Sequence, residues 1–191
     1  MSEIKAGTIT VYLGSMYAGK TSALIREYRR WKSIDKKTLM INHTLDDRYG
    51  HSNMMSTHDQ DQPSIPCCAV AQLRDVDANK LQATEAIFIN EGQFFDDLLD
   101  TCLYWCEKLG KHLFICGLDG DRDRKPFGQM LFLLPFATDY HKLTAKCQIC
   151  KDGTDASFTL DTENKRAKSQ IIVGTTQYLP VCRQHYLEIN A

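Results

Sequence analysis

The sequence lacks several features that assign many proteins to a class at first sight. No apolar run approaches the roughly 20 residues of a membrane-spanning helix, and Met1–Lys5 lack the apolar core of a signal peptide. The 23 basic and 24 acidic residues leave a net charge of −1, so no basic field favours a nucleic-acid partner. No internal repeat or low-complexity tract is present either. We therefore expect neither a membrane protein nor a nucleic-acid-binding protein.

The length and the cysteines narrow the class further. A chain of 191 residues is enough for one ordinary domain with a small appendage. Eight cysteines in a secreted chain would indicate disulfides. Here no export signal is seen, and Cys102, Cys106 and Cys116 fall inside apolar segments. The cysteines therefore favour a reducing cytoplasm, with some of them on a metal ion.

The segment Gly14–Thr21 fits G-x-x-x-x-G-K-[ST], the pattern of a loop that binds phosphates. A β-branched, aromatic strand is expected before it at 8–13, and a helix with one apolar face after it at 21–28. Such a turn directs backbone N–H groups and the positive end of the helix at an anion. Lys20 would then reach the phosphates of a nucleotide and the Thr21 hydroxyl would bind Mg²⁺. The alternative is a turn that matches the pattern by chance.

The rest of the chain predicts an α/β protein with a mostly parallel sheet covered by helices on both faces. Further strands are expected at 37–42, 67–70, 86–89 and 113–118, and apolar residues at helical spacing predict a helix over 95–109. The polar segment from His43 to Pro66 shows little periodicity and is expected to be a long, mobile loop.

Polar residues follow the predicted strand at 86–89. In phosphate-loop enzymes the end of such a strand carries an aspartate that orients Mg²⁺, and Glu91 is well placed there to accept a proton from a substrate hydroxyl. A carboxylate that caps the next helix is the alternative. Asp46-Asp47-Arg48 either reaches the phosphates or is a solvated charge cluster, and Asp119–Gly128 is either a substrate-facing loop or a charged turn.

The C-terminal part carries two C-x-x-[CH] pairs about thirty residues apart. Cys147, Cys150, Cys182 and His185 suit tetrahedral zinc, and four protein ligands would make the zinc structural. Strands are expected between the pairs at 156–160 and 170–173, with a flexible tip at 161–168. We expect a phosphate-loop domain at 1–145 and a zinc-binding subdomain at 146–191. Unrelated free cysteines are the alternative.

Together these residues resemble the small, zinc-containing class of thymidine kinases from animals, bacteria and large DNA viruses. The resemblance runs from Gly7 to about Tyr186. Besides the phosphate loop and the zinc set, the matching motifs are Asp46–Tyr49, Thr57-His58-Asp59, Glu91–Phe95, Leu118-Asp119-Gly120, Lys125–Gly128, Leu143–Cys147, Ala156–Thr159, and Ile172-Val173-Gly174 with Tyr178.

The resemblance implies ATP-dependent phosphorylation of the 5′-hydroxyl of thymidine or deoxyuridine, with Glu91 as general base and Lys20 at the transferred group. The implied ATP-binding residues are Gly14, Ser15, Met16, Tyr17, Ala18, Gly19, Lys20, Thr21, Asp46, Asp47, Arg48, Asn90, Glu91, Gly92 and Gln93, with Thr21 and Asn90 at Mg²⁺. The implied nucleoside-binding residues are Met16, Phe94, Leu118, Arg122, Phe127, Thr159, Ile171, Ile172, Val173 and Tyr178. A loop between the zinc ligand pairs would cover the nucleoside as a flap. A homotetramer inhibited by thymidine triphosphate is implied as well.

Three positions depart from the family pattern. Asn90 stands in place of an aspartate, Arg122 in place of a residue that is often aromatic, and Leu160-Asp161 in place of a usually basic pair. The loss of charge at Asn90 leads to the hypothesis of nucleoside and ATP binding with reduced turnover. The alternatives are a catalytically silent relative, a kinase for another nucleoside, and a zinc-bearing ATPase or nucleic-acid module, which the absent basic face disfavours.

Overall fold

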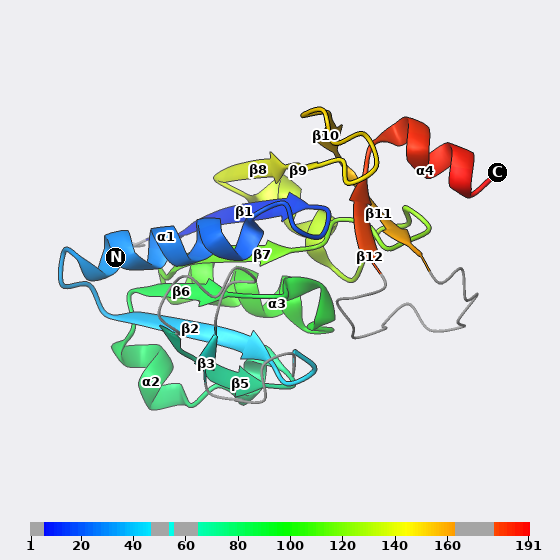
Figure 1. Ribbon diagram of the computed structural model, residues 1–191. Helices are drawn as coiled ribbons and strands as arrows, with labels where there is room; N and C mark the ends of the chain where they lie inside the picture. The colour runs from blue at the N-terminus through cyan, green and yellow to red at the C-terminus, as the bar shows by residue number, and fades with distance from the viewer. Residues whose placement is uncertain (1–5, 47–53, 56–64, 163–177) are drawn as a thin grey trace.

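The computed structural model describes residues 6–46, 54–55, 65–162 and 178–191, and its centre is a six-stranded parallel sheet in the order β5-β2-β6-β7-β1-β8 (Figure 1). Its strands are β1 (Thr8–Gly14), β2 (Thr38–His43), β5 (Cys68–Val70), β6 (Ala86–Ile89), β7 (His112–Gly117) and β8 (Asp139–Leu143). The predicted α/β class with a parallel sheet is confirmed. The edge strand β8 was not predicted, because its residues are polar and mostly exposed.

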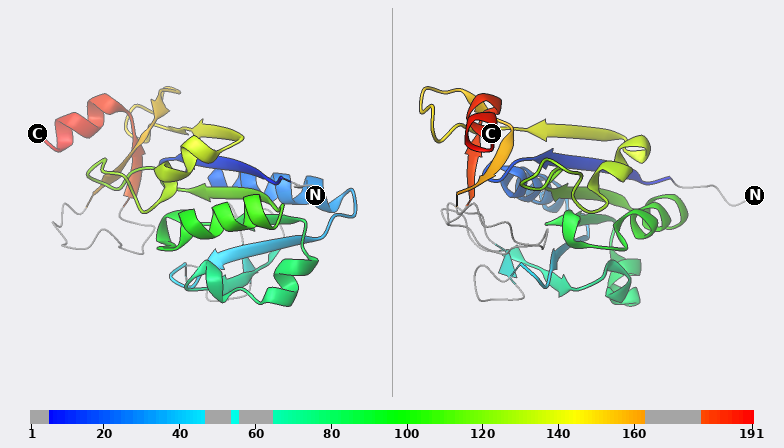
Figure 2. Two further views of the ribbon diagram at one scale, coloured as in Figure 1. Left: turned by 180° about the vertical axis from the view of Figure 1, so that it is seen from behind. Right: turned by 90° about the vertical axis from the view of Figure 1, so that its right-hand side faces the viewer.

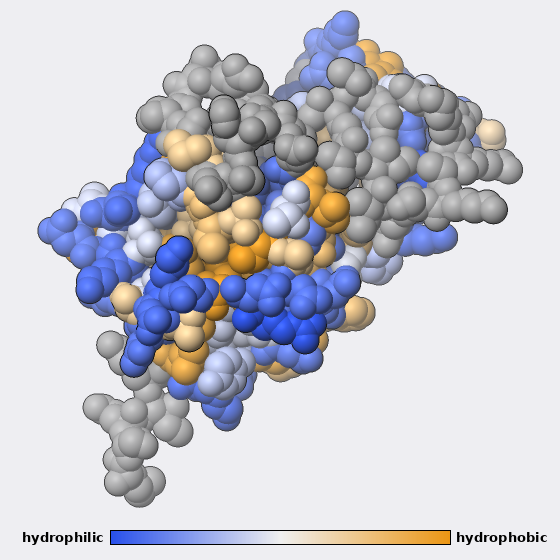
Figure 3. All heavy atoms as spheres, turned by 90° about the horizontal axis from the view of Figure 1, so that it is seen from below, coloured by the Kyte–Doolittle hydropathy of each residue, from blue (hydrophilic) through white to orange (hydrophobic). Residues whose placement is uncertain are grey.

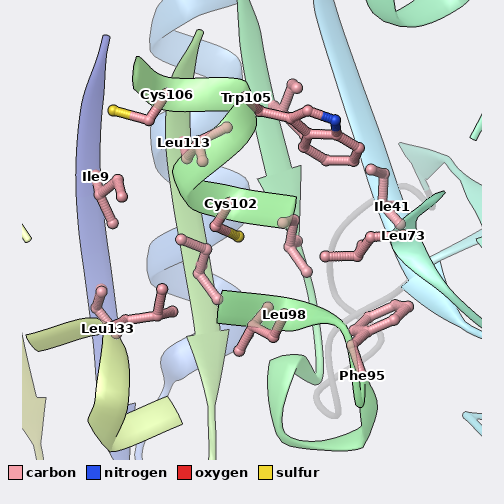
Figure 4. Close-up of a cluster of buried hydrophobic side chains, with 14 of the residues drawn as sticks. Ile9, Ile41, Leu73, Phe95, Leu98, Cys102, Trp105, Cys106, Leu113 and Leu133 are labelled. Carbon is pink, nitrogen blue, oxygen red and sulfur yellow. The ribbon is translucent and has the colours of Figure 1, made fainter. Parts of the chain in front are cut away.

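The strand residues alternate between two apolar clusters, one on each face of the sheet. On β6, Ile87 and Ile89 belong to one cluster, whereas Ala86 and Phe88 belong to the other. Helix α1 (Lys20–Lys32) covers the second face, and α3 (Leu98–Leu103) covers the first (Figures 1 and 2). Figure 4 shows the side chains of the α3 cluster filling the space between this helix and the sheet.

The helices are partly as expected. Helix α1 is longer at both ends than the helix predicted at 21–28. The helix predicted at 95–109 begins only at Leu98 and passes into a π-helical turn, η3 (Tyr104–Lys108). The other helical segments are η1 (Leu73–Asp75), α2 (Ala78–Ala83), η2 (Gly92–Phe94), η4 (Met130–Phe136) and α4 (Arg183–Ile189). Within the described ranges, no helix combines the length and the apolar character required to span a bilayer.

The sequence predicts one long, mobile loop from His43 to Pro66, but two short strands lie in its described part. Strands β3 (Met54–Met55) and β4 (Ile65–Pro66) pair in antiparallel fashion. Met55 and Ile65 are buried in the cluster beneath α1, and this burial orders the two short strands. On the face drawn in Figure 3, apolar residues gather in the middle, and polar residues border them on the left and below.

The described residues 145–162 and 178–191 form a C-terminal segment beyond the carboxyl ends of the central strands, and we call the described residues 6–143 the sheet body (Figure 2). The segment contains β9 (Ala145–Lys146), β10 (Asp155–Ala156), β11 (Phe158–Asp161), β12 (Tyr178–Val181) and helix α4. Strand β11 corresponds to the strand expected at 156–160. The strand expected at 170–173 lies outside the described residues.

Candidate functional site

The loop between β1 and α1 has the backbone of an anion-binding turn. Gly14 has φ 146°, and a Cβ there would lie 2.3 Å from the Leu143 carbonyl oxygen, so only glycine fits. Gly19 has φ 77° and immediately precedes the first residue of α1. The first N–H groups of this helix therefore face the loop, where no carbonyl of the helix can accept their hydrogen bonds.

Lys20 and Thr21 stand at the start of α1 and face the loop. The Lys20 ammonium donates to the Ser15 carbonyl oxygen at 2.7 Å, and the Thr21 hydroxyl donates to Asn90 Oδ1 at 3.2 Å. The Thr21 hydroxyl oxygen and Asn90 Oδ1 are neutral, hard oxygen ligands of the kind that Mg²⁺ takes in phosphate-binding sites. A cavity of about 660 Å³ adjoins the loop along α1, and its lining includes Arg26, Arg29 and Arg30.

Glu91 follows β6 in a left-handed conformation, with φ 52° and ψ 45°. A non-glycine residue rarely adopts this conformation, and such strain is concentrated at functional sites. The Gln93 side-chain amide donates to Glu91 Oε2 at 2.6 Å and accepts from the Leu118 N–H at 3.0 Å. Gln93 therefore ties the carboxylate to the loop that follows β7.

The Cys116 thiol, on β7, is influenced by both charged groups of the site, Glu91 and Lys20. The pKa of the Cys116 thiol is raised to about 12, chiefly by burial and also by the Glu91 carboxylate, against the lowering effect of the Lys20 ammonium. Both charges therefore act on the same buried sulfur near the carboxyl end of β7. The thiol stays protonated and donates to Asn90 Oδ1 at 3.1 Å.

The C-terminal segment contacts the phosphate loop directly. The Ser15 hydroxyl donates to the Ala156 carbonyl at 3.0 Å, and the Met16 N–H donates to the Thr159 hydroxyl at 3.1 Å. The resemblance implies a nucleoside role for Thr159, and its hydroxyl here also holds the loop backbone. Residue spacing alone gives no sign of this contact, because it joins groups separated by 143 positions.

Several residues expected at the nucleoside gather beside Gln93. Phe94 and Phe127 meet edge to face, with ring centroids 5.8 Å apart. Arg122 precedes Phe127 in the same loop, and its Nη1 pairs with Asp161 Oδ2 at 3.0 Å. The two departures from the family pattern at Arg122 and Asp161 are thus partners of each other. Tyr178 is buried on β12 and is paired in register with Asp161.

The predicted metal ligands Cys147, Cys150, Cys182 and His185 come together, and their ligand atoms all lie within 4.8 Å of one another. His185 Nδ1 is 3.3 Å from Cys182 Sγ and 3.4 Å from Cys150 Sγ. Bonds of about 2.0–2.3 Å around tetrahedral zinc set ligand atoms roughly 3.5–3.8 Å apart, so the group fits zinc. Burial raises the pKa of the Cys147 thiol, but hydrogen bonds, chiefly from backbone N–H groups, outweigh it and lower the pKa to about 6.

Some predicted site residues lie outside the described residues, namely Asp47, Arg48, Ile171, Ile172 and Val173. Two residues that the sequence did not single out do lie in the site. Asn42 ends the strand predicted at 37–42, and Cys116 lies near the end of the strand predicted at 113–118. Since parallel strands place their carboxyl ends at one edge of a sheet, both could have been found from their positions.

The fold and the site define a class: a parallel α/β protein with a phosphate-binding type of turn at a helix start, joined to a Cys3His group that can hold zinc. The sequence profile described as "Thymidine kinase" matches residues 7–186. The chain belongs to the thymidine kinase family, and the resemblance expected from the sequence is confirmed.

Curated relatives agree with this assignment. A thymidine kinase of Oryza sativa subsp. japonica is 38% identical over 187 residues, covering 95% of this chain and 67% of the relative. One from Yaba monkey tumor virus is 38% identical over 186 residues, covering 97% and 98%. The cytosolic thymidine kinase of Homo sapiens is 37% identical over 183 residues, covering 95% and 74%.

Proposed function

We propose that the protein transfers the γ-phosphoryl group of ATP to the 5′-hydroxyl of thymidine, and of deoxyuridine, in deoxynucleotide salvage. The observation that carries the proposal is the hydrogen bond from Thr21 to Asn90, which joins the start of α1, with Lys20, to the end of β6, with Glu91. The two meet at the carboxyl ends of the strands, where phosphate ligands bind. A base for the hydroxyl and a cation for the phosphoryl group are the two groups that this reaction needs from the protein.

In the proposed reaction the Glu91 carboxylate takes the proton of the 5′-hydroxyl as its oxygen forms a bond to the γ-phosphorus. The bond from this phosphorus to the β–γ bridging oxygen breaks, and ADP leaves. Gln93 supports this role because its amide fixes one Glu91 oxygen at 2.6 Å. Lys20 stabilises the transferred group. Thr21 and Asn90 would hold Mg²⁺, and this ion would supply positive charge that neutralises the phosphates. The remaining ATP contacts are those of the phosphate loop, Asp46, Asp47, Arg48, Gly92 and Gln93.

We propose a nucleoside pocket on the Phe94–Phe127 side of the site. The edge-to-face pair and the nearby Leu118 backbone support this position. The other proposed members are Met16, Arg122, Thr159, Ile171, Ile172, Val173 and Tyr178. Zinc at the Cys3His group has four protein ligands and leaves no open position, so its proposed role is structural.

The division at residue 145, the cytoplasmic location and the assembly state are proposals too. A separate apolar cluster in the C-terminal segment supports a subdomain there. Unoxidised cysteines support a reducing compartment. Self-association is supported by the exposed edge strand β8 and the nearby exposed Phe132, Phe136 and Tyr140, and the family resemblance implies a homotetramer. Inhibition by thymidine triphosphate would follow if this triphosphate occupied the nucleoside site and the phosphate site at the same time.

The proposal is tested by measuring phosphoryl transfer from ATP to thymidine with Mg²⁺, beside a panel of the other deoxynucleosides. We expect turnover selective for thymidine and deoxyuridine. Glu91→Gln should lower kcat by roughly 100- to 10,000-fold, since it removes the base but keeps the shape. Glu107→Gln, on the exposed side of η3, is the matched control and should leave kcat unchanged.

Two results would overturn the proposal. Wild-type protein that binds thymidine and ATP without turnover would make it a silent relative. Turnover that prefers another deoxynucleoside would make it a kinase of different base specificity. Retained turnover in Glu91→Gln would remove Glu91 from the mechanism.

A further inference from the structure

A chain of hydrogen bonds runs from the start of α1 to Asp46 through two buried amides. Thr21 donates to Asn90 Oδ1 at 3.2 Å, Asn90 Nδ2 donates to Asn42 Oδ1 at 3.0 Å, and Asn42 Nδ2 donates to Asp46 Oδ2 at 3.0 Å. Asn42 and Asn90 are only 5% and 2% exposed. Their strands β2 and β6 are adjacent and parallel, so the two amides come from neighbouring strand ends.

The carboxylate at one end fixes the direction of every bond in this chain. An ionised carboxylate only accepts hydrogen bonds, so the NH₂ end of the Asn42 amide must face Asp46. The Asn42 oxygen then faces Asn90, which must turn its own NH₂ group toward it. The Asn90 oxygen is left facing Thr21 and the Cys116 thiol, which both donate to it.

We propose that Asn42 and Asp46 are positioning residues that hold the Asn90 amide with its oxygen, rather than its NH₂ group, toward Thr21. The inference rests on the proposed function, in which this oxygen and the Thr21 hydroxyl belong to the Mg²⁺ site. An inverted amide would present hydrogen atoms to a cation. Asp46 therefore orients the Asn90 amide through Asn42. Asn90 itself, the buried residue that contacts Thr21, carries no charge.

This arrangement predicts that Asn90→Asp, without a second substitution, destabilises the protein. A carboxylate there has no hydrogen to donate to the Asn42 oxygen, so the Asn42 amide must turn around. Its oxygen then faces Asp46, and two carboxylates compete for one NH₂ group. Asp46→Asn removes this conflict, because an amide at position 46 can donate to the turned Asn42. The double variant Asn90→Asp/Asp46→Asn thus reverses the whole chain and leaves each member satisfied.

The test compares wild type, Asn90→Asp, Asp46→Asn and the double variant in urea unfolding, a readout independent of activity. We expect Asn90→Asp to unfold at a lower urea concentration than wild type and the double variant to recover most of this loss. Asp46→Asn alone should stay close to wild type, because an amide oxygen at position 46 can still accept from Asn42. Additive losses in the double variant would overturn the inference. Because unfolding needs no turnover, this outcome is distinct from failure of the proposed kinase activity.

The second measurement is the Mg²⁺ concentration that half-saturates binding of an ATP analogue, with the KM for thymidine measured alongside. Asn42→Ala should raise the half-saturating Mg²⁺ concentration about tenfold, as removal of an outer-shell partner of a metal ligand does, and leave the thymidine KM unchanged. The matched control is Thr38→Val on the same strand, whose buried hydroxyl has no hydrogen-bond partner in the described structure. Lower stability of Asn42→Ala with an unchanged Mg²⁺ requirement would overturn the positioning role.

Discussion

The sheet body and the C-terminal segment are stabilised in different ways. In the sheet body, two apolar clusters enclose both faces of six strands. In the C-terminal segment, the strands are two to four residues long and the buried cluster is small, with Cys147 among its members. A region that buries so little apolar area needs a cross-link, and the Cys3His group can provide one.

Besides Ala18, which packs on the apolar cluster of the C-terminal segment, the two regions meet through polar groups, charged groups and rings. The Arg124 guanidinium lies 4.5 Å from the Tyr186 ring centroid, and the Tyr186 hydroxyl donates to the Arg122 carbonyl at 2.5 Å. The phosphate loop adds hydrogen bonds to Ala156 and Thr159. Apolar burial therefore orders the sheet body. The segment that carries half of the proposed site is ordered by directional contacts and, in the proposed function, by zinc.

Removal of zinc should separate the two regions most strongly. Metal binding can contribute roughly 10 kcal/mol to ordering a small site, so a chelator or Cys182→Ser should expose the backbone amides of the C-terminal segment to rapid hydrogen exchange. The fluorescence of Trp31 and Trp105, both in the sheet body, should stay close to that of native protein. Cys68→Ser, on β5, is the matched control and should keep the metal. Unchanged exchange in the metal-free protein would contradict this assignment.

Truncation of the sheet core should have the opposite effect. Phe88 is fully buried and stacks on Phe114 with ring centroids 4.8 Å apart. Phe88→Ala should lower the free energy of unfolding by about 3–5 kcal/mol, because it removes contacts and leaves a cavity. Urea unfolding followed by tryptophan fluorescence measures the loss, and the zinc content of the folded protein should not change. Ile34→Ala, at a 63% exposed residue, should stay within about 0.5 kcal/mol of wild type.

The difference between the regions also explains how much the sequence could predict. Strands such as β6 and β7 are buried on both faces, so they are continuous apolar runs that the sequence reveals. Strand β8 lies at the edge with four of its five residues exposed, and its composition matches that of a loop. The zinc ligands were predicted because their spacing is local within each pair.

The candidate site was predictable where it follows from strand ends. Asn90 and Glu91 follow a buried strand, and parallel strands place such residues at one edge. The left-handed backbone of Glu91 could not be predicted, since glutamate does not favour it. The bond between Met16 and Thr159 depends on how the C-terminal segment packs against the phosphate loop, which no local pattern encodes.

The Arg122–Asp161 pair offers a test of the contact between the two regions. Its side chains are 17% and 10% exposed, between the cases of a surface pair and a buried pair. Arg122→Ala should lower the free energy of unfolding by about 1–3 kcal/mol and speed hydrogen exchange in β11. The swapped double variant, Arg122→Asp with Asp161→Arg, should recover part of this loss. Arg74→Ala is the control and should have little effect, because the Arg74 side chain is 65% exposed and its Nε lies 3.9 Å from Asp97 Oδ2. An equal loss of unfolding free energy in Arg122→Ala and in the swapped double variant would show that attraction between the two charges contributes nothing.

A weaker, pH-dependent effect should be confined to the sheet body. His43 is 6% exposed, and its ring centroid lies 4.7 Å from that of Phe95. The Leu45 N–H donates to His43 Nδ1 at 3.0 Å, a bond that requires this nitrogen to be unprotonated. Desolvation by burial lowers the pKa of His43 below its ordinary value of 6.5.

Between this lowered pKa and 6.5, the unfolded chain binds more protons at His43 than the folded chain does. The contribution of His43 to stability is therefore complete above pH 6.5 and is lost as the pH falls below it. His43→Gln should flatten the fall in the free energy of unfolding between neutral and mildly acidic pH, as measured by urea unfolding and tryptophan fluorescence. Because both tryptophans lie in the sheet body, acid release of metal from the C-terminal segment does not directly alter this signal. An equally steep fall in His43→Gln would place the responsible proton on another group.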